Sequence, residues 1–150
     1  MKRFDFRLKS VLVLRRRLLN EAEGKYSSAI QRRKQAEAEF SEGLQKLSAM
    51  NKNVVRTRDA RVAGYQQEAY VGALNRAKAN LVRIEKKVTL ARKHEEQEKL
   101  AYIEANKNHE LLLKLRERQY VKHMYDEQLK EQLAMDDLFN ARKSILNAAK

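Results

Sequence analysis

Few side chains in this 150-residue chain could do chemistry, and their spacing keeps them apart. The candidates are three histidines and two pairs of adjacent acids: His94, His109, His123, Glu95-Glu96 and Asp136-Asp137. The histidines stand 15 and 14 residues apart, too far along a helix to share a metal ion. Adjacent acids on a helix point about 100° apart and do not converge. Without any Cys there is no thiolate ligand or Cys nucleophile. We therefore predict that the chain is not an enzyme and holds no metal or cofactor.

The histidines and acids are expected to lie on long helices. The chain has no Pro and only four scattered Gly, the residues that usually mark turns and helix ends. Scattered glycines also exclude a Gly-rich phosphate loop. Long helices leave no concave pocket, so we expect no small-molecule ligand.

The first third of the chain repeats every seven residues. One series carries large residues: Leu12, Leu19, Tyr26, Arg33, Phe40, Leu47 and Val54. A second series, three residues on, is mostly small: Arg15, Ala22, Ala29, Ala36, Gly43 and Met50. This alternation of three and four predicts a seam that faces a partner helix. Arg15 and Arg33 interrupt it, either with charged ends that reach solvent or as residues that fix the register.

A second pair of series follows the first. It begins near Tyr70 and comprises Leu74, Leu81, Val88, Glu95, Tyr102 and His109, with Ala77, Ile84, Ala91, Glu98, Ala105 and Leu112. After Leu112 the stripe shifts toward Leu115, Val121, Met124 and Leu129. The fold class predicted is all-α, a long two-helix antiparallel coiled-coil hairpin. We expect a single domain over 1–150, with helix one at about 6–55, a turn within 55–66 and helix two at about 67–146.

A fold-back near residue 62 sets the register of the two helices. Arg33 then faces residues 91–98, and we predict that it pairs with Glu95. Such a buried ion pair specifies register more than it adds stability.

The same register leaves the end of helix two without a partner beyond about residue 125. The segment is nevertheless apolar: Leu129, Leu133, Met135, Leu138, Phe139, Ile145 and Leu146. An uncovered apolar stripe usually marks a binding site, although pairing with itself in a dimer or fraying is the alternative.

Positive charge is concentrated at the other end. Residues 1–34 carry 11 Lys or Arg against three acids, in a chain whose net charge is +13. Arg15, Arg16 and Arg17 point in different directions around a helix, and no nucleic-acid-reading motif accompanies them. We expect an acidic protein surface as partner, not nucleic acid. A merely solvated basic face is the alternative.

Short motifs at both ends and in the middle carry a family resemblance. They are Phe4-Asp5-Phe6-Arg7-Leu8-Lys9-Ser10-Val11-Leu12 followed by Arg15-Arg16-Arg17, then Tyr65-Gln66-Gln67-Glu68-Ala69-Tyr70, then Glu131-Gln132-Leu133-Ala134-Met135-Asp136-Asp137-Leu138-Phe139. In these segments, and in its length and basicity, the chain resembles the FliJ family of flagellar export proteins.

The resemblance implies a mechanical function. The family is similar to the central stalk of rotary ATPases and inserts one end into the pore of the hexameric export ATPase of the flagellar type III apparatus. The matching residues here are Phe4, Phe6, Leu8, Leu12, Arg15, Arg16, Leu133, Leu138 and Phe139. The opposite end of the family's hairpin contacts the cytoplasmic part of the export-gate membrane protein. The matching residues are Tyr70, Leu74, Ala77 and Leu81, where Leu81 departs from the polar residue expected.

The resemblance also implies binding of empty export chaperones, a property for which these residues give no signal. It implies a cytoplasmic protein, peripheral at the inner membrane, that serves flagellum biogenesis and motility. The early apolar stretch, Val11 to Leu14, is too short for a signal peptide or a membrane span, which agrees with a cytoplasmic location. Two alternatives remain open: the equivalent stalk of a virulence-type secretion system, and a self-associating structural coiled coil.

Overall fold

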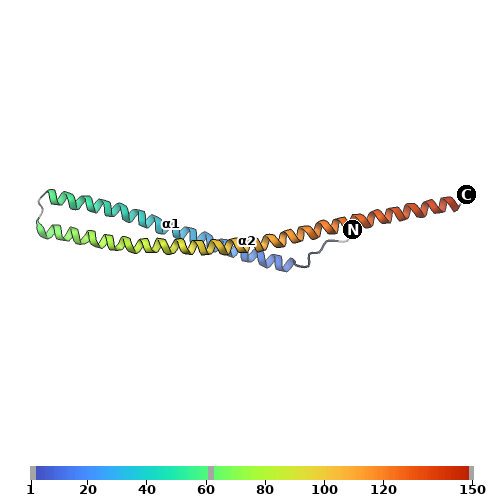
Figure 1. Ribbon diagram of the computed structural model, residues 1–150, viewed down its shortest axis with the longest axis horizontal. Helices are drawn as coiled ribbons and strands as arrows, with labels where there is room; N and C mark the ends of the chain where they lie inside the picture. Colours follow the sequence, from blue (N-terminus) through green and yellow to red (C-terminus); the bar gives the residue numbers. More distant parts are fainter. Residues whose placement is uncertain (1–2, 61–62, 149–150) are drawn as a thin grey trace. The chain divides into compact units, whose positions relative to one another are not determined.

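A computed structural model describes residues 3–60 and 63–148, with side chains up to residue 144. It contains two helices, α1 (Lys9–Asp59) and α2 (Gly64–Ala148), and no strand in the described residues (Figure 1). The two helices pack against each other, so the predicted all-α fold is confirmed. The chain divides into two compact units. We call residues 20–104 the loop unit, and residues 1–19 with 105–150 the terminal unit. That they form a single domain stays a prediction.

Local hydrogen bonds mark where the helices begin and end. The amide of Lys9 donates to the carbonyl of Phe6 at 3.0 Å, which starts α1. Arg56 and Arg58 lie in the last turn of α1, where positive charge favours the helix dipole. The amide of Gln66 donates to the Ala63 carbonyl at 3.0 Å, in the first turn of α2. The predicted turn range, 55–66, includes residues 61 and 62, which lie outside the described residues.

Within the loop unit, α1 and α2 lie side by side (Figure 1). The small seam residues allow this close approach: Ala29 is 1% exposed and Ala36 is 0% exposed. On α2, Leu74 and Val88 are buried as well. At Gly43 an added Cβ would lie only 2.9 Å from Cδ1 of Leu81. The alternation of large and small residues therefore forms the core of this unit.

Polar contacts fix the register of the loop unit. Arg33 donates from Nε to Glu95 of α2 and from Nη1 to Glu37, the latter at 2.7 Å. Glu37 in turn accepts from Arg92 Nη2 at 2.9 Å. The predicted Arg33–Glu95 pair is thus present and belongs to a four-residue network across both helices. The rings of Tyr26 and Tyr102 stack at 5.8 Å in the same register.

The terminal unit has a different inner face. The residues before α1 are not helical, and Phe4 places its ring 5.4 Å from Tyr120 and 5.6 Å from His123 of α2. Phe6 is buried. An extended chain rises about 3.3 Å per residue against 1.5 Å in a helix, so this short segment reaches further along α2 than a helix would.

Two predictions about this part of α2 are corrected. The unpartnered stretch does not begin at about 125, because Asp126 is half-buried and Glu127 is buried. Of the four residues predicted to continue the seam, Met124 is half-buried, but Leu115 and Leu129 are exposed. Val121 does not belong to the seam either but faces outward and is 61% exposed. It lies about 100° from Tyr120 and 160° from His123 around the helix, and those two residues contact Phe4.

Candidate protein-binding surfaces

The residues expected at the ATPase end all lie in the terminal unit, but in two groups. Phe4, Phe6 and Leu12 line one cleft, together with three cationic side chains, Arg3, Lys9 and Arg116. The cleft combines aromatic surface with positive charge. Because most of Phe6 is already covered, the cleft presents mainly its charged rim to a partner, three cations with the one acid Asp5.

The first two turns of α1 add further basic surface. Arg15 is half-buried and Arg16 is exposed, so only the second of the two predicted arginines is fully available. Leu8, just before α1, is 37% exposed. Val13 and Leu14, which were not among the predicted residues, are more exposed than Leu12 and line a shallow groove with Arg17.

The second group lies on the uncovered end of α2, which we call the tail (residues 128–144). Every side chain of the tail is exposed. Leu138 and Phe139 are each 70% exposed, and Leu133 is 56% exposed. At 100° per residue these three side chains point in three different directions around the helix. The tail is therefore apolar on several sides, which suits a partner that surrounds it better than one that touches a single face.

The residues expected at the gate end lie in the loop unit and are mostly used by the fold itself. Leu74 is buried, and Ala77 and Leu81 are half-buried. Tyr70 is 45% exposed and is the one predicted gate residue that presents a free surface. Tyr65 is even more exposed, at 74%, and it lies in the first turn of α2 beside Gln66, whose amide donates to its hydroxyl at 3.4 Å.

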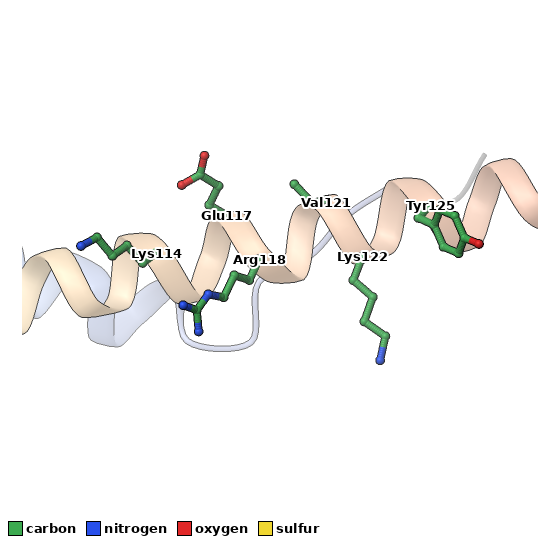
Figure 2. A pocket seen from close by; sticks show the side chains of 6 residues that line it. All are labelled: Lys114, Glu117, Arg118, Val121, Lys122 and Tyr125. Carbon is green, nitrogen blue, oxygen red and sulfur yellow. The ribbon is translucent and has the colours of Figure 1, made fainter.

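A further surface was not predicted from the sequence. Six side chains of α2 line a shallow groove on the outward face of the terminal unit: Lys114, Glu117, Arg118, Val121, Lys122 and Tyr125. All six come from one helix (Figure 2). Their spacing of three and four was the available signal, but Val121 was assigned to the seam and Tyr125 to no surface.

The pKa shifts in the described residues come from ion pairs both within and between the two helices. Arg92, and then Arg33, hold the pKa of the Glu37 carboxyl below its usual range by hydrogen bonding. Glu95 raises the pKa of Arg33 above its usual value. No group of three or more His, Cys, Asp or Glu side chains among the described residues could hold a metal ion. The pKa shifts therefore belong to ion pairs that stabilise the helices.

Within the described residues, neither α1 nor α2 contains a stretch that is long and apolar enough to cross a bilayer.

Comparison with known proteins agrees with the geometry. No curated protein and no solved structure gives a significant match to the chain. The family model described as "Flagellar FliJ protein" matches residues 4–148, almost the whole length. That family is a component of flagellar protein export and not a known family of enzymes. The chain therefore belongs to the FliJ family of flagellar export proteins.

Proposed function

We propose that the chain acts as a stalk of the flagellar export machinery, with the terminal unit in the pore of the hexameric export ATPase and the loop unit at the export gate. The observation that carries the first half is the tail. It exposes Leu133, Leu138 and Phe139 in three directions, as a helix enclosed by a ring requires. The family match to the flagellar FliJ protein favours the flagellar system over a virulence-type one.

The terminal unit also supplies charge for such a ring. Arg3, Lys9 and Arg116 surround the cleft of Phe4 and Phe6, and Arg16 and Arg17 follow on α1. Basic side chains at the rim of an interface mainly guide association with an acidic surface. An asymmetric helix pair in a symmetric ring presents a different face to each subunit, so changes in the ring could be passed along the helices.

The proposed contact with the ATPase ring is tested with purified cognate ATPase. Addition of the chain is expected to promote hexamer formation and turnover. The double variant Leu138→Asp with Phe139→Asp should weaken this effect by about tenfold or more, because buried apolar contacts dominate interfaces. Asn140→Asp is the control, since it adds charge to the same turn and leaves the apolar residues intact. No effect of the wild-type chain at any ratio would refute the stalk.

The proposed contact with the export gate is tested separately. Tyr70→Ala should weaken binding to the cytoplasmic part of the export-gate protein, because Tyr70 is exposed and contributes little to the core. Glu68→Ala, at an exposed position two residues away, is the control. Equal binding of both variants and the wild type would remove Tyr70 from the gate contact.

A further inference from the structure

The outward groove of Figure 2 continues into the tail as one stripe along α2. Successive steps of four or six residues keep its apolar members within about 120° of arc around the helix. They are Val121, Tyr125, Leu129, Met135 and Phe139, with exposures of 61%, 65%, 44%, 70% and 70%. We call this set the outer stripe. The inner face of the same helix carries Tyr120 and His123 against Phe4, so the outer stripe is separate from the contact that builds the unit.

The segment of α2 that carries the outer stripe has charge of opposite sign at its two ends. Residues 114–122 carry four Lys or Arg and one Glu, whereas residues 126–137 carry five acids and one Lys. Asp126 is half-buried and Glu127 is buried, so the exposed acids of the second block are Glu131, Asp136 and Asp137. Over 114–140 there are five cations against six acids, in a chain with a net charge of +13. This segment is thus nearly neutral as a whole, and two copies could meet there with little mutual repulsion.

We propose that the outer stripe is a self-association surface on which two copies of the chain pair antiparallel about Leu129. In that arrangement the basic block of each copy lies against the acidic block of the other. A parallel pair would place like charges together. The two-fold symmetry makes the interface self-complementary, so every contact occurs twice.

The antiparallel register also matches the apolar residues. Lys122 and Asp136 lie seven residues before and after Leu129, so each Lys122 meets Asp136 of the second copy. Val121 then lies near Phe139 of the second copy, and Tyr125 near Met135 of the second copy. Leu129 meets its own counterpart at the two-fold axis. This pairing covers the five apolar residues of the outer stripe with one occupant.

The expected dimer is weak and does not depend on the stalk function. About 25 residues of each helix take part, a length of roughly 37 Å. Two helices of this length bury less than the area of a standard stable interface. Phe139 is shared with the proposed ring contact, so a dimer would hide it until the copies separate. Self-association is measured without any ATPase, and its failure would leave the stalk proposal untouched.

The first test is sedimentation equilibrium of the full chain from micromolar to hundreds of micromolar concentration. The wild type is expected to form a dimer. Lys122→Glu and Asp136→Lys should each weaken the dimer by about fivefold to tenfold, because each reversal acts at both symmetric contacts. The double variant should recover most of the wild-type affinity. Lys86→Glu, an exposed charge reversal in the loop unit, is the control.

The second test uses the absence of native Cys. Leu129→Cys should form an intermolecular disulfide under mild oxidation, since only a residue near the two-fold axis meets itself in an antiparallel pair. Lys143→Cys, 14 residues away, should remain monomeric under the same conditions. Circular dichroism of each variant checks that helix content is kept. A chain that is monomeric at every concentration overturns the proposal, and so does a dimer that ignores both charge reversals or is cross-linked at Lys143→Cys instead.

Discussion

The loop unit and the tail use helices of the same kind in opposite ways. In the loop unit, the apolar side chains of α1 and α2 cover each other around Ala29, Ala36, Leu74 and Val88. In the tail every side chain is exposed, although its apolar content is similar. The difference lies in what faces the helix and not in helix propensity. It teaches that an apolar stripe is core where a partner helix is in register and a binding surface where the chain supplies none.

The largest expected effect comes from making the same substitution, Leu to Ala, in the loop unit and in the tail. Leu74→Ala should lower the free energy of unfolding by about 2–3 kcal/mol, because it leaves a cavity in the seam of the loop unit. Leu133→Ala in the tail should change it by less than about 0.5 kcal/mol, because that side chain is already in solvent. Urea unfolding followed by circular dichroism measures both. Equal losses would mean that the tail is covered by the chain itself or by a second copy.

A smaller effect concerns the charge network around Arg33 in the loop unit. Glu95→Lys places a cation against Arg33 and should lower the melting temperature by several degrees, less than Leu74→Ala does. The exchange Arg33→Glu with Glu95→Lys should recover part of the loss, since Glu37 would then repel the new acid at position 33. An unchanged melting curve for Glu95→Lys would show that this pair does not specify the register.

The smallest effect separates two glycines of α1 within the loop unit. Gly24→Ala should stabilise the protein by about 1 kcal/mol, because Ala favours a helix and nothing lies within 4 Å of the added Cβ. Gly43→Ala should gain less or become destabilising, since its Cβ would lie 2.9 Å from Leu81 Cδ1 and that side chain must move. Thermal unfolding of the two variants measures the difference. The same gain at both positions would show that α2 does not approach α1 closely at Gly43.

Much of the fold followed from the repeat in the sequence. Every seam residue named from Leu12 to Leu112, apart from Tyr70, is buried or half-buried in the structure. The Arg33–Glu95 pair was predictable because two interruptions of complementary charge fall in register when the helices fold back. A seven-residue repeat sustained over many turns leaves little freedom about which face meets the partner.

Less of the candidate site could be predicted. The sequence pattern did not separate Tyr70, which is exposed, from Leu74, which is buried, because both fit the same stripe near its beginning. It also assigned Val121 to the seam. Once the regular repeat shifts after Leu112, several helix faces carry comparable apolar residues, and periodicity alone does not rank them.

The sequence by itself determined two long helices, their antiparallel register and an apolar end without a partner helix. These properties depend on local helix preference and on a repeat whose period is fixed by backbone geometry. Only the tertiary structure decided how far α2 is covered. The segment around Phe4 contains no seven-residue repeat from which its contacts could be predicted. It is not helical, and Phe4 lies against Tyr120 and His123. That contact turns Val121 and Tyr125 outward and so creates the outer stripe.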